Sequence, residues 1–464
     1  MKAYLCLFTG SLPQVIEQLP NFIERIVRSN YMQRPNPKSI FFIRPVGIGL
    51  RSIPPYGLLS LQAYLGQYNI DSYIFDREVK KRLPDLKKTM EQQSVSVVGI
   101  SALTCQLQDA QYLVRKIRQW FDSKVIIVAG GQHFTVKPED ALEVGCDYVI
   151  KGDGEISLSE CLIDGFPNQK IIERKLLSNL DEIPQIKMSN LQPFIFKESH
   201  GSKGFYTILT SRGCPYRCNF CLGINQRSTK IRNHSIEYFV EYVKNVHKTF
   251  GIKTFFIPDD IFILNPARVI KFCTLIKETF DTKLRFHCFI HAGLGSPELF
   301  AIMKAAGFFR VSMGAEHGND QILEVCGKKV TVADIEKTCS IVHGQGLELS
   351  LSFILGNITE TDTTITETVD FAIYLHKKYN TLSWFSFMQP LPGAPVYDVA
   401  EEYGVYLQKK HTWHNTDLIY LPFGVSQKHI LKERKRGFRF ANPINSRSLF
   451  HKIIKKLNQI CLFK

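Results

Sequence analysis

Three cysteines stand close together in the stretch Ser211-Arg212-Gly213-Cys214-Pro215-Tyr216-Arg217-Cys218-Asn219-Phe220-Cys221, with the spacing Cys-x3-Cys-x2-Cys. Three thiolates on one short loop can wrap one corner of a soft-metal cluster, and iron–sulfur cubanes are held by cysteines at such spacings. A structural zinc site normally closes with four ligands, and no further Cys or His follows at a suitable spacing before His234. The stretch therefore favours a 4Fe–4S cluster with one iron open to an outside ligand, over a zinc site or unliganded cysteines.

A βα rhythm surrounds this loop and continues toward the C-terminus. Apolar runs alternate there with helical patterns, such as 235–250 with Ser235 as its N-cap. The expected strands are Phe205–Thr210, Thr254–Pro258, Leu284–Ile290, Phe309–Gly314, Glu348–Leu355 and Leu382–Met388. Six such units indicate a barrel or partial barrel, in which functional groups gather at the carboxyl ends of the strands.

A second βα rhythm precedes the loop. Its expected strands are Ser39–Val46, Ser72–Asp76, Ser96–Leu103, Lys124–Ala129 and Asp147–Ile150. They lack polar alternation and are separated by helices, which indicates a parallel sheet that is covered on both faces. We therefore expect a doubly wound domain that binds its ligand at the carboxyl ends of the strands. Glycine-rich loops stand at these ends, although each one alone is a weak signal because glycine turns are common there.

Around the cysteine stretch the sequence resembles the radical SAM superfamily, whose mark is a Cys-x3-Cys-x-aromatic-Cys loop on a partial (βα)6 barrel. Phe220 fills the aromatic position. Other segments similar to the family's are Pro258-Asp259-Asp260, Met313-Gly314-Ala315-Glu316-His317-Gly318 with His317 in place of the usual Ser, Gly327-Lys328, and Pro390-Leu391-Pro392-Gly393-Ala394. One segment departs from the pattern: the family's Gly-Leu-Pro-Gly-Glu-Thr turn is replaced by Gly356-Asn357-Ile358-Thr359-Glu360-Thr361.

This resemblance implies roles for particular residues. Cys214, Cys218 and Cys221 would hold the 4Fe–4S cluster, whose open iron binds S-adenosyl-L-methionine (SAM). Phe220 would contact the adenine, and Glu316 would reach the methionyl or ribose end of SAM. Asp259 and Asp260 are candidates to line the SAM pocket, and a helix N-cap at the strand end is the alternative for them.

Residues 39–165 are similar to the cobalamin-binding domain that precedes the barrel in one branch of that superfamily. The candidate cobalamin contacts in its strand-end loops are Gly57, Leu58, Ser101, Gly130, Gly131, Gln132, Gly152, Gly154 and Glu155. Many such domains supply an axial His after the first strand, where this chain has Pro45-Val46-Gly47-Ile48-Gly49. We therefore expect cobalamin without an axial His, and His133 is the less favoured alternative.

The two resemblances together imply a class B-like radical SAM methyltransferase. It would place a methyl group on an unactivated carbon, or on a phosphinate phosphorus, through a 5′-deoxyadenosyl radical and methylcobalamin. A cobalamin-dependent cyclase or rearrangement enzyme acting on a tetrapyrrole- or natural-product-like substrate is the alternative. An RNA-modifying radical SAM enzyme is less favoured because neither a second Cys-rich domain nor an RNA-binding barrel is evident. A non-catalytic cobalamin sensor is less favoured because it has little use for the cysteine triad.

Charge is concentrated in the tail. The chain has 58 Lys and Arg and 43 Asp and Glu, a formal net charge of +15, and residues 404–464 hold 13 of these basic residues and two of the acidic ones. The pattern excludes a chain that is basic throughout, as ribosomal proteins are. A dense basic run, Lys428–Arg439, precedes apolar residues at helical spacing from Leu449 to Ile460. Residues 428–463 therefore either pack on the barrel or lie on an anionic membrane surface.

The expected organisation is an N-terminal extension (1–38), a cobalamin-binding domain (39–165), a Pro-punctuated linker (166–202), a radical SAM barrel (203–403) and a basic, mostly helical C-terminal region (404–464). No membrane-spanning run and no signal peptide are evident, and clustered cysteines indicate a reducing compartment. We expect a cytoplasmic protein, or one peripheral at the inner face of the membrane. Expected partners are a small-molecule substrate, such as a lipid or another apolar natural product, and a low-potential electron donor of the flavodoxin or ferredoxin type; nucleic acid is not expected.

Overall fold

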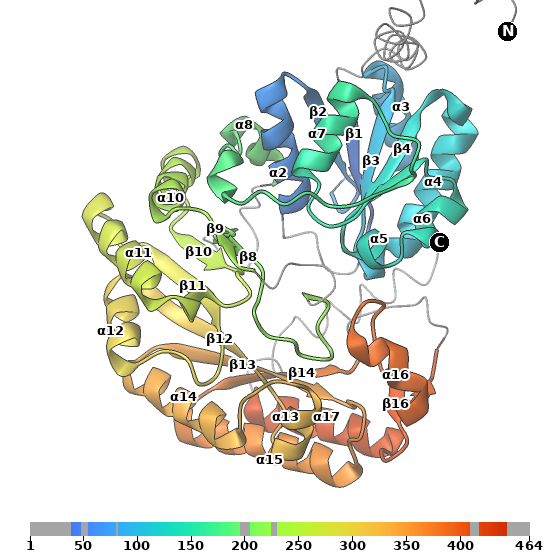
Figure 1. Cartoon of the computed structure of the whole chain (residues 1–464). Helices are drawn as coiled ribbons and strands as arrows, with labels where there is room; N and C mark the ends of the chain where they lie inside the picture. The colour runs from blue at the N-terminus through green and yellow to red at the C-terminus, as the bar shows by residue number, and fades with distance from the viewer. Residues whose placement is uncertain are drawn as a thin grey trace, which may run out of the picture.

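The computed structural model describes residues 39–47, 54–79, 82–194, 205–223, 230–408 and 417–442. It contains two parallel six-stranded sheets, each with its own helices (Figure 1). The doubly wound domain and the partial barrel expected from the sequence are both confirmed. The extension 1–38 and the apolar pattern at 449–460 lie outside the described residues.

The N-terminal sheet has the strand order β2-β1-β3-β4-β5-β6. Its strands are β1 (Ser39–Arg44), β2 (Asp71–Asp76), β3 (Val97–Ser101), β4 (Ile126–Gly130), β5 (Tyr148–Ile150) and β6 (Ile171–Ile172). The order reverses between β1 and β3, which is the point where doubly wound folds bind their ligands. The sixth strand was not expected, because two residues within the linker are too short to give a periodic signal.

Both faces of this sheet are covered, which explains why its strands are apolar throughout. Phe41 and Ile43 of β1 pack toward α3 (Leu83–Gln92) and α4 (Leu107–Phe121). Ile40 and Phe42 point the other way. They pack with apolar residues of the second layer, α2 (Tyr56–Leu65) and α7 (Glu155–Asp164). The remaining short helices of the domain are α5 (Gln132–Val136) and α6 (Glu139–Val144).

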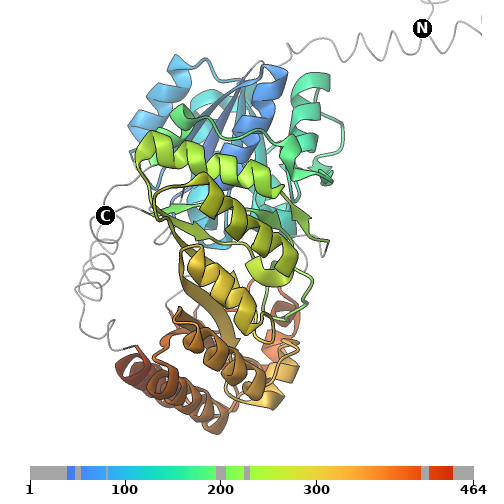
Figure 2. The ribbon, with the colours of Figure 1, turned by 90° about the vertical axis from the view of Figure 1, so that its left-hand side faces the viewer.

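The second sheet has the strand order β14-β13-β12-β11-β10-β7, and its two edge strands are not paired with each other. Its strands are β7 (Phe205–Thr207), β10 (Thr254–Ile257), β11 (Arg285–Ile290), β12 (Phe308–Glu316), β13 (Glu348–Leu355) and β14 (Leu382–Phe387). The helices along its outer face are α10 (Ile236–Phe250), α11 (Pro266–Thr279), α12 (Pro297–Ala305), α14 (Val332–Gly344) and α15 (Asp362–Tyr379) (Figure 2). Ser235 caps α10 as expected, since its side chain accepts a hydrogen bond from the Tyr238 N–H.

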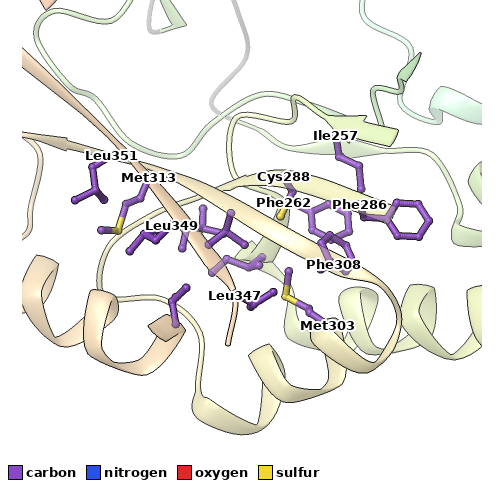
Figure 3. Packing of buried hydrophobic residues seen from close by; sticks show 14 of the residues in the cluster. Ile257, Phe262, Phe286, Cys288, Met303, Phe308, Met313, Leu347, Leu349 and Leu351 are labelled. Atoms are coloured by element: carbon purple, nitrogen blue, oxygen red, sulfur yellow. The ribbon is translucent and has the colours of Figure 1, made fainter. Parts of the chain in front are cut away.

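Alternate residues of these strands form the largest hydrophobic core (Figure 3). Phe286 and Phe308, on neighbouring strands, have ring centroids 5.3 Å apart, and Phe262 lies 5.6 Å from Phe308. Because side chains alternate along a strand, the residues between them face the open, inner side of the half-barrel.

The basic run lies on a helix that packs against the barrel. α17 (Gln427–Ala441) lies beside α15 and β14. The Phe438 ring lies 5.4 Å from that of Phe385, and Arg436 forms an ion pair with Asp370. The segment before it holds α16 (Pro395–Tyr403) and an antiparallel pair, β15 (Gly404–Tyr406) and β16 (Tyr420–Pro422). Within the described ranges, no helix has the length and apolar character needed to cross a membrane.

Candidate cofactor sites

The cysteine loop leaves and re-enters the barrel through a short antiparallel ladder. This ladder pairs β8 (Ser211–Arg212) with β9 (Arg232–Asn233). Cys214 is half-buried, Cys218 is buried and Cys221 is exposed, and all three are free thiols. Burial raises the pKa of Cys218 to about 12. The soft donor set fits an iron–sulfur cluster, which would have to displace these protons on binding.

The loop is held by the turn after α13 (Asp320–Val325), the short helix that follows β12. The Asn219 N–H donates to the Cys326 carbonyl at 2.8 Å, and the Asn219 side chain donates to the Val325 carbonyl at 2.8 Å. Gly327 has φ +67, and a Cβ there would press on the Arg217 carbonyl. This segment of the family pattern therefore packs directly on the cysteine loop. No three His, Cys, Asp or Glu side chains of the described part converge closely enough to hold a single metal ion.

Glu316 ends β12 beside the cysteines. Its carboxylate pairs with Lys328 at 2.9 Å, and both side chains are 9 % exposed. The backbone at Glu316 has φ +63, and the register with β13 shifts between Gly314 and Glu316. A side chain in the left-handed region at a bulge is a costly arrangement that is typical of functional sites. Phe220 lies nearby in a cluster with Met388 and Ala394, so the segment after β14 also reaches this region.

His317 contacts the turn at 356–361, the segment that departs from the family pattern. The Glu360 carboxylate accepts hydrogen bonds from the Gly356 and Asn357 N–H groups at 2.6 and 2.8 Å, which closes the turn. Its other oxygen lies 3.4 Å from His317 Nδ1, and both side chains are fully buried. Burial lowers the pKa of His317, but the Glu360 charge and the contact with Cys326 outweigh it and raise the pKa to about 10.

Of the two aspartates after β10, one is internal and one faces a pocket. Asp259 is fully buried, and its carboxylate accepts hydrogen bonds from the backbone and hydroxyl groups of Thr210 and Ser211. The helix N-cap considered from the sequence is therefore wrong for Asp259, because the next helical segments are capped by Ile261 and Asn265. The carboxylate instead fixes the segment that enters the cysteine loop, and its contact with SAM stays a prediction. Asp260 lines the pocket described next.

A cavity of about 380 Å³ lies between the two domains. All nine residues named from the sequence as cobalamin contacts line it: Gly57, Leu58, Ser101, Gly130, Gly131, Gln132, Gly152, Gly154 and Glu155. Gly131 has φ +89, and a Cβ there would overlap the Ala102 backbone. Only glycine therefore suits this rim, where a ligand can approach the main chain.

The sequence missed the far wall of this cavity, which comes from the linker and the barrel. Its residues include Leu180, Ile183, Arg212, Arg232, His234 and Tyr238. His234 stacks on Tyr238 at 4.3 Å, and its Nδ1 lies 3.1 Å from Asp181. No local pattern marks these residues, because their proximity to the first domain arises only when the two domains meet.

His133 is occupied elsewhere. Its Nδ1 lies 3.2 Å from the Thr104 hydroxyl and its Nε2 lies 2.9 Å from the Asp140 carboxylate, and the side chain is 1 % exposed. It does not line the cavity, and in this arrangement neither ring nitrogen is available as an axial ligand.

Comparisons with known proteins identify both domains. A model of the radical SAM superfamily matches residues 208–372, and a model of the B12-binding domain matches residues 51–162. An uncharacterised methyltransferase of Pyrococcus horikoshii is 29 % identical over 367 residues, which cover 75 % of this chain and 78 % of the relative. The anaerobic magnesium-protoporphyrin IX monomethyl ester cyclase of Rubrivivax gelatinosus is 22 % identical over 350 residues, covering 69 % and 62 %.

A similar fold occurs in a solved structure of the radical S-adenosylmethionine methyltransferase TsrM from Kitasatospora setae, with cobalamin and a [4Fe-4S] cluster bound. The TM-score is 0.63 at 18 % identity, covering 79 % of this chain and 75 % of TsrM. Both domain models, the order of the domains and the shared fold lead to one conclusion: the chain is a member of the radical SAM superfamily that carries a B12-binding domain ahead of its radical SAM domain.

Proposed function

We propose that the chain is a cobalamin-dependent radical SAM methyltransferase. The observation that carries the proposal is the cavity, because the strand-end loops of one domain and residues next to the cysteine loop of the other line the same space. When bound, a reduced cluster supplies the electron that cleaves SAM to a 5′-deoxyadenosyl radical, and cobalamin supplies the methyl group.

The chain's own residues position and shield these groups. Cys214, Cys218 and Cys221 would hold the cluster, and Lys328 keeps the Glu316 carboxylate directed beside them. Asp259 accepts hydrogen bonds from Thr210 and Ser211, so the backbone just before the cysteine loop is fixed in position. A cavity enclosed by two domains excludes water from reactive intermediates.

An apolar substrate is the class that the inner face of the half-barrel supports best. Phe289 of β11 and Trp384 of β14 lie between core residues of their strands, so both face inward. They are 37 % and 45 % exposed, so both offer apolar surface to a ligand on this face. A lipid or a flat natural product would cover them.

Label transfer tests the reaction. Anaerobically reconstituted protein with methyl-labelled SAM, a chemical reductant and candidate apolar substrates should move label into a product. Consumption of substrate with no label in any product would instead favour the cyclase alternative, which the similarity to the Rubrivivax gelatinosus protein supports.

Spectroscopy tests the cofactors separately from the reaction. Replacing Cys214, Cys218 and Cys221 together by Ala should abolish the electron paramagnetic resonance signal of the reduced cluster. Cobalamin absorbance should persist in this variant, because none of the three thiols lines the cavity. An iron signal that survives would contradict the cluster assignment.

The electron donor and the membrane contact are also proposals. A flavodoxin or ferredoxin should replace the chemical reductant.

Because α17 packs on the barrel, residues 443–464 are the part to delete when membrane contact is tested. Anionic liposomes should sediment the full chain but not residues 1–442, and equal sedimentation would assign the contact elsewhere.

A further inference from the structure

A network of ion pairs joins the loop after β5 to the base of the cysteine loop. Asp153, between the cavity residues Gly152 and Gly154, binds two arginines from the other domain. Arg212 Nη1 lies 3.0 Å and Arg232 Nη2 lies 2.7 Å from the same carboxylate oxygen. These arginines are paired residues of the β8–β9 ladder, the antiparallel pair at the base of the cysteine loop.

A second set of contacts reinforces the first. The other terminal nitrogen of Arg212 donates to Glu155 Oε1 at 2.8 Å and to the Ser60 hydroxyl at 2.9 Å, and this hydroxyl donates to the same Glu155 oxygen. One arginine thus spans the loop after β5, α7 and α2. It does so two residues before Cys214.

These charges are largely removed from solvent. The Arg232 and Glu155 side chains are each 5 % exposed, Arg212 is 19 % exposed and Asp153 is 24 % exposed. Burial alone would raise the pKa of Asp153, but the two arginines hold it below its usual range. Removing one partner of such a pair leaves an uncompensated charge, so the geometry is strongly maintained.

We propose that Asp153, Arg212 and Arg232 are positioning residues that form an interdomain clamp, which couples occupancy of the cobalamin cavity to the order of the cysteine loop. The proposal rests on the proposed function, and its chemical reason is alignment. A methyl donor and a radical source bound to different domains must stay in register, and a misplacement of about 1 Å can cost roughly 100-fold in rate.

Hydrogen exchange of the whole chain, with and without hydroxocobalamin, tests the clamp. In the wild type, cobalamin should slow exchange of amides at 213–223. Asp153→Asn should bind cobalamin by absorbance with an affinity within about threefold, because the neutral side chain still accepts one hydrogen bond. Its loop amides should lose most of the added protection.

Two further variants separate the clamp from general damage. Glu160→Gln on α7 removes an equal charge from an exposed pair with Lys175 and should behave as the wild type. Arg212→Lys keeps the charge but not the forked geometry, so it should fold and show intermediate coupling. In reconstituted protein, cob(II)alamin and the reduced cluster should interact magnetically with a single strength in the wild type. In Asp153→Asn, the interaction strength should vary from molecule to molecule, because the distance between the two centres is no longer fixed.

The outcomes are distinct. Undiminished loop protection in both Asp153→Asn and Arg212→Lys would overturn the clamp and leave the proposed function standing. A wild-type chain that takes up no cobalamin would overturn the proposed function and the clamp together. Loss of coupling in Glu160→Gln as well would overturn the clamp, since the effect would then follow total charge.

Discussion

His291 is a residue of the barrel that contacts the cysteine loop directly. Its ring stacks on Tyr216 with centroids 4.0 Å apart and planes at 9°, and it is 5 % exposed. Burial, assisted by the Lys328 charge, lowers its pKa to about 4, so the ring is neutral at pH 7. Its Nε2 has no hydrogen-bond partner among the described residues. Such an atom is costly to leave unpaired and would be satisfied by a bound polar cofactor.

His291→Phe should therefore keep the stack and remove the nitrogen. We expect the cofactor-free chain to be at least as stable as the wild type, and the affinity for SAM to fall about tenfold, the equivalent of one lost hydrogen bond. Thermal unfolding and equilibrium dialysis with labelled SAM measure the two effects. His291→Ala, which also removes the stack, serves as the comparison. Unchanged SAM affinity in the Phe variant would show that His291 Nε2 does not bind SAM.

The pair of His317 and Glu360 should make stability depend on pH. The folded pKa of His317 is raised to about 10, so its stabilising contribution is complete below its unfolded pKa of about 6.5 and is lost as pH rises toward 10. His317→Ser should remove this dependence. The difference in unfolding free energy between wild type and variant should shrink between pH 6.5 and 10 in urea titrations. A constant difference would show that the pair is not charged.

At the scale of elements, α17 is positioned by a glycine. A Cβ at Gly437 would come within 2.6 Å of the Phe385 ring of β14, so this helix approaches the sheet edge as closely as a backbone can. Gly437→Ala should cost about 1 kcal/mol net, because overpacking outweighs the gain of about 1 kcal/mol in helix propensity. Urea unfolding measures it, with Leu431→Ala, at an exposed position of the same helix, as the control. A higher unfolding free energy for Gly437→Ala than for the wild type would show that α17 can shift away from Phe385 at little cost.

Strands of three or more residues in the two large sheets were predictable from sequence, whereas the two-residue strands β6, β8 and β9 were not. β13 matches the expected bounds, 348–355, because eight apolar-rich residues give a clear signal. The ladder of Ser211 and Arg212 with Arg232 and Asn233 has two residues on each side, and only tertiary pairing defines it. β12 runs two residues past its expected end, through the bulge that holds Glu316, since a bulge breaks the alternation on which the prediction depends.

At the scale of the whole molecule, the shared cavity predicts joint stabilisation. Because both domains line it, cobalamin at about 100 times its dissociation constant should stabilise the chain by about 2.7 kcal/mol. Calorimetry should show the unfolding of both domains shifting together. A shift confined to the N-terminal domain would mean that the barrel wall contributes nothing to binding.

The sequence identified the near wall of the site and not the far one. Gly131 and Glu155 could be found because they lie in strand-end loops with a recognisable order. Arg212 and His234 could not, since their neighbours across the cavity are distant in sequence and no periodicity relates them. The hydrogen bonds of Asp259 were not predictable for a similar reason, because its partners Thr210 and Ser211 are about fifty residues away in sequence.

The exposure of Cys221 has a consequence for maturation. Under the proposed cluster assignment, an exposed thiol on a loop whose base is fixed by the β8–β9 ladder would allow iron and sulfide to be inserted after the chain has folded. The same exposure leaves the immature chain vulnerable, since oxidation of accessible cysteines leads to disulfides or sulfenic acids that no longer bind iron. Cluster insertion therefore competes with air, and the yield of mature protein depends on how soon after synthesis the iron arrives.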